Sequence, residues 1–218
     1  KTTTISMISG MISKTSGTIS VSGEEVINKY RQMIGYCPQH NAFMRYFTVK
    51  GHLMFFGALR GLSKTECESH VKQLLYKLNL TDKANEYGNN LSVGMKRRLC
   101  LGNAIVGNTH SISVNLFLYD EPTSGLDPQS RRQLWTILLD LRKDHTIFLT
   151  THYMEEAETL ADKIFIIAHG ERLCSGTSIQ FKKKYSVGYI LKLLTNDHFD
   201  QDKTMELIHK YIPGAEID

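Results

Sequence analysis

Short apolar runs rich in β-branched and aromatic residues recur along the chain and predict β-strands. Runs of this kind, without the spacing of a helix, are typical of strands that a sheet buries on both faces. They comprise Thr18–Val21, Ile34–Cys37, Leu116–Tyr119, Thr146–Thr150 and Ile164–Ala168. Each has the length of a single strand.

Other segments show the three- and four-residue spacing of amphipathic helices. Ser63 and Glu66 have the spacing of a capping box, and Pro128 stands where the first residue of another helix would be. The apolar positions that follow are Val71, Leu74, Leu75 and Leu78 in the first helix, and Leu134, Ile137, Leu138 and Leu141 in the second. Strands that alternate with helices predict an α/β fold with a mostly parallel sheet covered by helices.

The pattern also divides the chain into one main domain and the start of another. Residues 1–186 carry the strong strand patterns, but about residues 41–108 within them show none, which predicts an inserted helical subdomain. After about Val187 the pattern weakens, with a strand-like run at Tyr189–Leu194 and a helix-like one at Thr204–Tyr211. We therefore expect residues 187–218 to begin a further unit.

Composition is that of a globular protein and excludes several other classes. Of the 218 residues 41% are hydrophobic and 22% are charged, and the net charge of +4 is mild. No apolar run approaches the roughly 20 residues that cross a bilayer, and the opening residues do not resemble a signal peptide. The four cysteines are far apart, so neither a disulfide framework nor a cysteine metal site is expected.

Candidate phosphate-binding and catalytic groups lie at the start of the chain and after the run that ends at Tyr119. Lys1 and Thr2 have the order found at the end of a P-loop, where the ammonium reaches phosphates and the hydroxyl binds Mg²⁺. Asp120 could hold Mg²⁺, and Glu121 could polarise an attacking water. Taken singly, Lys-Thr-Thr could belong to any exposed terminus, and Asp-Glu to an acidic turn.

Two further segments carry groups that could contact phosphate. Leu91–Arg98 reads as a turn of small residues that opens a basic helix, where Ser92 and the helix N-terminal amides would form an anion site. The alternative is an N-capped helix with a solvated Lys and Arg face. His152 follows a hydrophobic strand and could hydrogen-bond a γ-phosphate, although a lone His is more often structural.

Taken in order, these segments resemble the motifs of the ATP-binding cassette (ABC) family. Lys-Thr-Thr, Cys-Pro-Gln, Leu-Ser-x-Gly-Met, Asp-Glu-Pro, Ser-Gly-Leu-Asp-Pro and Thr-Thr-His correspond to the Walker A end, Q-loop, signature, Walker B, D-loop and switch histidine. Six ordered motifs agree by chance far less often than any single one. The resemblance implies a P-loop NTPase core with a helical subdomain that carries the signature.

The resemblance assigns the matching residues to two ATP molecules. Those that would serve this chain's own ATP are Lys1, Thr2 and Thr3 in binding, Thr2, Gln39 and Asp120 as Mg²⁺ ligands, and Gln39, Glu121 and His152 in hydrolysis. Ser92 and Gly94 would instead reach the ATP of a second cassette in a head-to-tail dimer, with Asp127 at the interface.

Flanking residues resemble subfamily A of this family, the lipid-exporting branch. The stretches are Tyr36–Asn41, Thr48–Leu53, Gly57–Gly61, Lys96–Leu99, Thr151–Ala157 and His169–Tyr189, and the last is most similar to the first of the two cassettes in those transporters. The resemblance implies as partners a second cassette and transmembrane domains in the same full-length chain. It also implies a lipid substrate, no nucleic-acid partner, a regulatory segment after Tyr189, and a place on the cytosolic face of a membrane.

Three features depart from the family pattern. The Gly-rich part of the P-loop does not precede Lys1, so we expect the chain as given to bind ATP poorly. Val93 stands where the family usually has Gly, and a β-branched residue brings bulk close to the partner's phosphate. Thr109–Asn115 lengthens the approach to Walker B, as a surface loop or a gene-model error.

Two other functions share these motifs. A soluble ABC ATPase of translation or DNA repair would carry the same catalytic residues, and the flanking resemblance argues against it. A weakly hydrolysing regulatory module is disfavoured by Glu121 and His152, whereas Val93 leaves open a difference between the two ATP sites. Because a fold alone does not determine function, the lipid assignment rests on resemblance.

Overall fold

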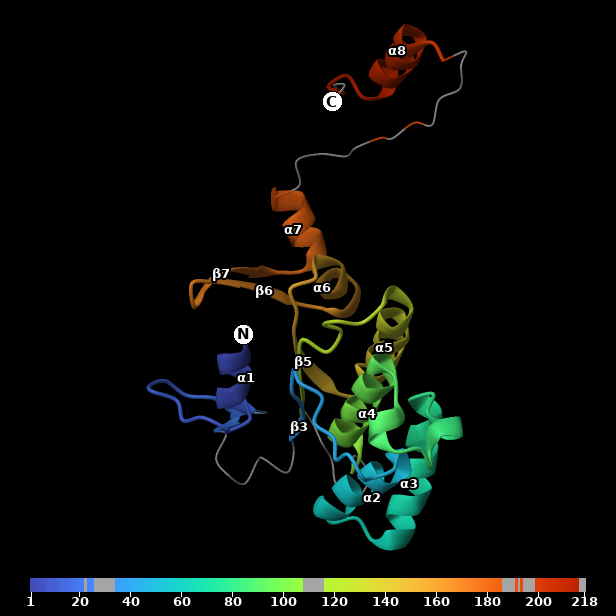
Figure 1. Cartoon of the computed structure of the whole chain (residues 1–218). Coiled ribbons are helices and arrows are strands. Elements are labelled where there is room, and N and C mark those ends of the chain that lie inside the picture. The colour runs from blue at the N-terminus through green and yellow to red at the C-terminus, as the bar shows by residue number, and fades with distance from the viewer. Residues whose placement is uncertain are drawn as a thin grey trace. The chain divides into compact units, whose positions relative to one another are not determined.

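The computed structural model describes residues 1–21, 23–25, 34–107, 116–185, 191, 193 and 199–215 (Figure 1). The chain forms two compact units, Lys1–Ser178 and Ile179–Asp218. The extension Thr109–Asn115 and most of the strand expected at Tyr189–Leu194 lie outside the described residues.

The first unit contains a parallel sheet in the order β3-β4-β5. These strands are Ile34–Cys37, Leu116–Asp120 and Thr146–Thr150, so β3 and β5 have the predicted bounds and β4 is one residue longer. Cys37 lies opposite Tyr119, which lies opposite Leu149. Because the strands are parallel and in register, their carboxyl ends meet at one edge. The predicted α/β class with a mostly parallel sheet is confirmed.

Alternate residues of β4 pack against opposite faces of the sheet, and all five of its residues are buried. Leu116 and Leu118 form a cluster with Ile34 and with Ile5 of helix α1 (Thr2–Ile8). Phe117 and Tyr119 belong instead to the larger core that α4 (Val93–Ile105) and α5 (Pro128–Leu141) help to form (Figure 1). Burial on both faces explains the uninterrupted apolar run in the sequence.

Between β3 and β4 the described chain is helical. It comprises α2 (Val49–Leu59), α3 (Lys64–Lys77), the 3₁₀ turns η2 (Thr81–Lys83) and η3 (Gly88–Asn90), and α4. The predicted capping box is present at the start of α3, where the Ser63 hydroxyl accepts the Glu66 N–H and the Glu66 carboxylate accepts the Ser63 N–H at 3.0 Å. Its predicted apolar positions, Val71, Leu74, Leu75 and Leu78, are all buried.

The remaining elements are short. An antiparallel pair, β1 (Ser20–Val21) and β2 (Glu24–Glu25), replaces the longer strand expected at Thr18–Val21. Helix α6 (Met154–Leu160) precedes an antiparallel hairpin of β6 (Ile164–Ala168) and β7 (Glu171–Gly176), and α7 spans Ser178–Tyr185. The two residues of the hairpin turn, His169 and Gly170, both have positive φ, as a type I′ turn requires.

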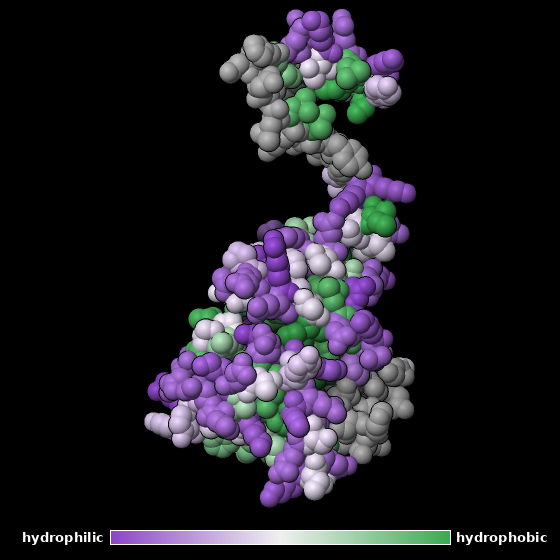
Figure 2. Space-filling model, turned by 90° about the vertical axis from the view of Figure 1, so that its right-hand side faces the viewer, coloured by the Kyte–Doolittle hydropathy of each residue, from purple (hydrophilic) through white to green (hydrophobic). Residues whose placement is uncertain are grey.

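The second unit contains helix α8 (Gln201–Tyr211), which confirms the helical character expected of Thr204–Tyr211. Its apolar side chains Leu207 and Tyr211 are exposed, and Figure 2 shows hydrophobic and hydrophilic side chains together in this unit. None of the described helices is both long and apolar enough to span a membrane.

His52 anchors the chain that follows β3 to helix α2. Its side chain is fully buried, its Nε2 accepts the Met44 N–H at 2.8 Å, and its Nδ1 donates to the Thr48 carbonyl at 2.8 Å. Because Nε2 accepts a hydrogen bond, the ring is neutral. Burial lowers the pKa of His52 below its ordinary value of 6.5.

This burial predicts a loss of stability in acid. Below pH 6.5 the unfolded chain binds a proton at His52 that the folded chain does not bind. The free energy of unfolding therefore falls as the pH decreases, by at most about 1.4 kcal/mol per pH unit from this residue. Urea unfolding of wild type and His52→Gln at pH 7.5 and 5.5 should show a smaller pH effect in the variant. His40→Gln, which removes an exposed histidine, is the control. An equal pH effect in His52→Gln and wild type would contradict this assignment.

Candidate active site

Three side chains that are distant in the sequence meet at the carboxyl edge of the sheet. The Lys1 ammonium donates to Glu121 Oε1 at 2.8 Å and to the Thr151 carbonyl at 3.1 Å. His152 Nδ1 lies 2.9 Å from Glu121 Oε2. Glu121 follows β4 and His152 follows β5, so the parallel pairing of these strands accounts for their proximity. Both oxygens of the Glu121 carboxylate therefore have a cationic or N–H partner.

These contacts set the charge of Glu121. The hydrogen bond from Lys1 is the main cause that lowers the pKa of the Glu121 carboxyl below its ordinary value, and His152 adds to it, while partial burial acts in the opposite direction. Glu121 is therefore ionised near neutral pH. If Lys1 moved away, the Glu121 carboxylate would be a stronger base, because the main cause that lowers its pKa would be removed.

The backbone of Glu121 adopts an uncommon conformation. Its φ is +45°, in the left-handed region that residues with a Cβ rarely occupy. Its N–H donates to both the carbonyl oxygen and the hydroxyl oxygen of Thr150, at 3.0 and 3.1 Å. Such strain costs about 1–3 kcal/mol and persists only where the surroundings fix it, most often at functional sites.

Asp120 has a carboxylate oxygen suited to a metal ion. The residue is fully buried, and its Oδ1 accepts the Thr150 hydroxyl at 2.5 Å. Its Oδ2 is buried and has no hydrogen-bond partner among the described residues. An unpartnered buried carboxylate oxygen is unfavourable unless a cation or donor joins it, and Mg²⁺ prefers oxygen ligands. Asp120 therefore fits the role of Mg²⁺ ligand that the sequence predicts for it.

The other predicted ligands are less confined. Thr2, Thr3 and Gln39 are exposed, and within the described residues no hydrogen bond from their side chains is present. No group of three or more His, Cys, Asp or Glu in the described ranges could hold a metal ion by itself. The Gln39 backbone is nevertheless fixed, because its carbonyl accepts a hydrogen bond from Arg97 at 3.1 Å.

Contacts between α5 and the chain that follows His152 restrain the loop in which His152 lies. The His152 and Tyr153 rings lie 4.1 Å apart between centroids, and the Arg131 guanidinium stacks over Tyr153 at 4.1 Å. Deeper in, Trp135 Nε1 donates to the fully buried Glu156 carboxylate at 3.0 Å. These contacts join α6 to α5 and limit the movement of the loop that carries His152.

Ser92, Gly94 and Asp127 lie at the N-terminal ends of α4 and α5. Ser92 is the N-cap of α4 and accepts the Met95 N–H at 3.3 Å. Asp127 is the N-cap of α5 and accepts the Ser130 N–H at 2.9 Å, and its hydrogen bonding with Ser130 lowers the pKa of the Asp127 carboxyl. Within the described residues no hydrogen bond or ion pair joins these three residues to Lys1, Glu121 or His152.

Gly94 is required by the close approach of these two helices. A Cβ at this position would lie 2.5 Å from Ser130 Oγ and 2.9 Å from Ser130 Cβ. The adjacent Val93 is 59% exposed, so its side chain is available to a molecule outside this chain. The turn predicted to serve a partner's ATP is thus solvent-facing at Ser92 and Val93, and packed at Gly94.

The sequence did not reveal the role of Arg97. A solvated basic face was one interpretation of α4, and it is wrong for Arg97 and Arg98, which are only 3% and 6% exposed. Arg97 follows the buried Gly94 by three positions and precedes the buried Leu101 by four, so helical spacing places it on the inner face. This spacing is the signal that could have identified it.

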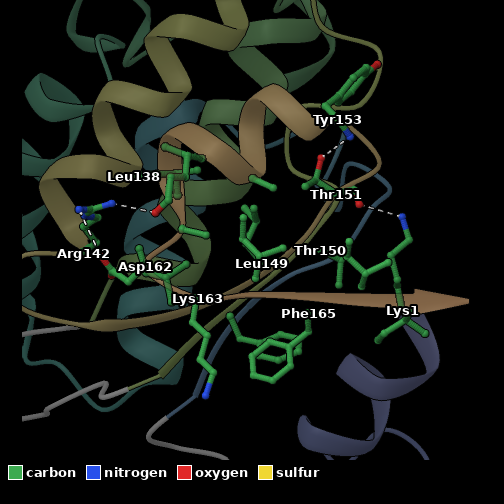
Figure 3. A pocket seen from close by; sticks show the side chains of 18 of the residues that line it. Lys1, Leu138, Arg142, Leu149, Thr150, Thr151, Tyr153, Asp162, Lys163 and Phe165 are labelled. Atoms are coloured by element: carbon green, nitrogen blue, oxygen red, sulfur yellow. Dashed lines mark hydrogen bonds and ion pairs between the residues drawn. The ribbon is translucent and has the colours of Figure 1, made fainter. Parts of the chain in front are cut away.

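A cavity of about 660 Å³ adjoins the site within the first unit. It is lined by the whole of β5, by residues 164–167 of β6 and by parts of α5 and α6. Figure 3 shows Lys1 and Thr151 at one end and the pair Arg142–Asp162 at the other, with Leu149 and Phe165 between them. Lys1 and His152 therefore border an otherwise largely apolar space.

Comparison with known proteins places this chain in a family. Residues 1–124 match the family described as "ABC transporter". A solved structure described as the ATP binding subunit of an ABC transporter superposes with a TM-score of 0.72 at 27% identity, covering 85% of this chain and 77% of that one. The α/β sheet with its ion-paired edge is thus the fold of an ABC nucleotide-binding domain, and the chain belongs to the ABC transporter family.

Curated proteins similar to this chain include members of subfamily A, as the flanking residues predicted. The phospholipid-transporting ATPase ABCA3 of Homo sapiens is 40% identical over 100% of this chain and 13% of its own length. The retinal-specific phospholipid-transporting ATPase ABCA4 of Homo sapiens is 40% identical over 89% of this chain and 8% of its own length. ABC transporter A family member 2 of Dictyostelium discoideum is 38% identical over 100% of this chain. The chain spans 13% of the length of the first of these relatives.

The contact between Gly94 and Ser130 predicts a specific steric conflict. Gly94→Ala should lower the free energy of unfolding by about 1–3 kcal/mol, because the new methyl group would overlap the Ser130 side chain. Gly94→Ala/Ser130→Gly should recover most of this loss when compared with Ser130→Gly alone. Urea unfolding of the four proteins measures the coupling. Additive effects of the two substitutions would contradict the conflict.

Proposed function

We propose that this chain is the ATP-binding and ATP-hydrolysing domain of a membrane transporter that moves phospholipids. The observation that carries the proposal is the contact of Glu121 with both Lys1 and His152 in a member of the ABC family. Lys1 lies 120 positions before Glu121 in the sequence, and His152 lies 31 positions after it. The names of the relatives, which describe phospholipid-transporting ATPases, support the lipid as the transported class. They do not favour a soluble ATPase of translation or DNA repair.

In this proposal, binding of ATP separates Lys1 from Glu121. The Lys1 ammonium, which is 37% exposed, turns to the phosphates, where the attraction between opposite charges is stronger than its pairing with one carboxylate. Thr2 and Thr3 follow Lys1 at the start of α1 and contribute hydroxyls to the same site. The pKa of Glu121 rises when Lys1 leaves, so arrival of the substrate makes the base stronger.

Glu121 and His152 then act on the water and the γ-phosphate. Glu121 accepts the proton of the attacking water. A carboxylate only accepts hydrogen bonds, so His152 donates its Nδ1–H to Glu121. Phosphate oxygens likewise accept, so a further hydrogen bond from Nε2 to the γ-phosphate requires a ring with a proton on both nitrogens. When bound, Mg²⁺ would neutralise phosphate charge, held by the Asp120 carboxylate together with Thr2 and Gln39.

The wider assembly is also part of the proposal. Ser92 and Gly94 serve the ATP of a second cassette, with Asp127 at the interface, and transmembrane domains in the same polypeptide couple hydrolysis to lipid movement. Residues 1–186 form the nucleotide-binding domain, with about 41–108 as its helical subdomain, and 187–218 begin a regulatory extension. The domain lies on the cytosolic face of the membrane and contacts no nucleic acid.

Glu121→Gln tests the catalytic role directly. The amide keeps the shape of the side chain but loses its basicity, so the rate of ATP hydrolysis by the transporter should fall by about 10²- to 10⁴-fold with ATP binding retained. Phosphate release and nucleotide binding are measured on the same preparation. Glu155→Gln, an exposed neighbour of His152, is the matched control and should retain the wild-type rate. Turnover by Glu121→Gln within a few-fold of wild type would exclude Glu121 as the base.

Val93→Gly tests the assignment of the signature to a partner's ATP. Glycine would let the backbone at the start of α4 approach the partner's γ-phosphate, so hydrolysis at the partner's site should rise by a few-fold. The affinity of this chain's own site should not change, because Val93 faces outward. The partner's site is isolated by combining Val93→Gly with Glu121→Gln. Altered nucleotide affinity at Lys1, with no change at the partner's site, would reverse the assignment.

A further inference from the structure

Arg97 donates five hydrogen bonds to backbone carbonyls beside the site. Its Nε donates to Pro122 O at 2.7 Å, Nη1 donates to Pro38 O and Gln39 O at 2.6 and 3.1 Å, and Nη2 donates to Asp120 O and Glu121 O at 2.9 and 3.1 Å. A guanidinium has five N–H donors, so every donor of Arg97 is used.

These carbonyls belong to the two segments that carry the proposed metal ligands and the base. Pro38 and Gln39 follow β3, whereas Asp120, Glu121 and Pro122 end β4 or follow it. The strands themselves fix the residues up to Cys37 and Asp120. Beyond their ends, the hydrogen bonds that join the two segments in the described part of the chain come from the Arg97 side chain, which projects from α4.

The chemistry of arginine suits such a link. Its planar fork holds acceptors in fixed directions, and hydrogen bonds from a charged donor are stronger than those between neutral groups. Arg97 is only 3% exposed, so its charge has lost most of its hydration. The carbonyl dipoles offset this cost of desolvation, because hydrogen bonds are stronger in a medium of low dielectric constant. A lysine at this position keeps the charge but has a single nitrogen, which cannot reach both segments with the same geometry.

We propose that Arg97 is a positioning residue that sets the distance between Gln39 and the Asp120–Glu121 pair, and through it the affinity of the site for Mg²⁺ together with ATP. This inference rests on the proposed function. Arg97 touches neither nucleotide nor metal in this scheme. It acts by holding the backbone carbonyls of two proposed Mg²⁺ ligands, Gln39 and Asp120, and of the proposed base, Glu121.

The chain offers a matched control one position away. Arg98 is also buried on α4, at 6% exposure, but it donates to the carbonyls of Leu78 and Asn79 at 3.0 and 3.1 Å, at the end of α3. Arg97→Lys and Arg98→Lys make the same chemical change on the same helix. Both should lower thermal stability, and only Arg97→Lys should alter the metal site.

The experiment measures the affinity of the transporter for a non-hydrolysable ATP analogue, with excess Mg²⁺ and with a chelator. The ratio of the two affinities is the gain due to metal. We expect Arg97→Lys to reduce this gain at least five-fold and to leave the metal-free affinity within two-fold of wild type. Its kcat for ATP should fall at least ten-fold, with KM at saturating Mg²⁺ less affected. Arg98→Lys should keep the wild-type gain.

Several outcomes would overturn the inference. They are an unchanged gain in Arg97→Lys, an equal loss of affinity with and without metal, or the same loss of gain in Arg98→Lys. If Arg97→Lys does not fold, Arg97→Gln, which keeps two N–H donors and removes the buried charge, takes its place with the same expectations. A wild-type protein without any gain from Mg²⁺ would instead refute the proposed function.

Discussion

Parallel pairing of β3, β4 and β5 is the constraint on which the site depends. Because parallel strands end at the same edge of a sheet, the segments that follow them converge although they are distant in the sequence. Gln39, Glu121 and His152 each lie one or two residues beyond a strand end. Strands buried on both faces also require a helix on each side. This requirement explains why α1, with Lys1 at its start, packs against Leu116 and Leu118 while α4 covers the opposite face.

The core and the carboxyl edge of the sheet differ in how polar groups are accommodated. In the core, backbone groups pair within strands and helices, and apolar side chains fill the space. At the edge the backbone leaves the sheet, and side chains satisfy its polar groups. The Thr150 hydroxyl accepts the Glu121 N–H, and Arg97 donates to carbonyls that follow β3 and to carbonyls at the end of β4. Asp120 Oδ2 is left without a partner among the described residues. Glu156 Oε2 is also buried without a partner among the described residues, but only Asp120 Oδ2 belongs to a residue at this edge, where the proposed chemistry needs a cation.

Local patterns predicted most of the fold and the residues at strand ends. The bounds of β3, β5 and β6 follow from short apolar runs. The caps at Ser63 and Ser92 follow from residue type and spacing, and Pro128 marks the start of α5. Ordered motifs pointed to Lys1, Glu121 and His152. The contact between Glu121 and His152 follows from the strand pairing, whereas that of Lys1 also needs the packing of α1 against the sheet. Helical spacing could place Arg97 on the inner face of α4, but its carbonyl partners come from two distant segments, which no local pattern records. The positive φ of Glu121 and the conflict at Gly94 likewise arise from tertiary packing.

The backbone of Glu121 has a consequence for laboratory evolution of this domain. Glycine and asparagine occupy the left-handed region at φ +45° more readily than glutamate does, so either residue would relax this turn. Selection for heat resistance alone would therefore enrich domains that have lost the proposed base, and under that proposal thermostability would rise as turnover disappeared. A library screened only by melting temperature would favour inactive sequences at this position, whereas a screen that also requires turnover would retain the strained glutamate.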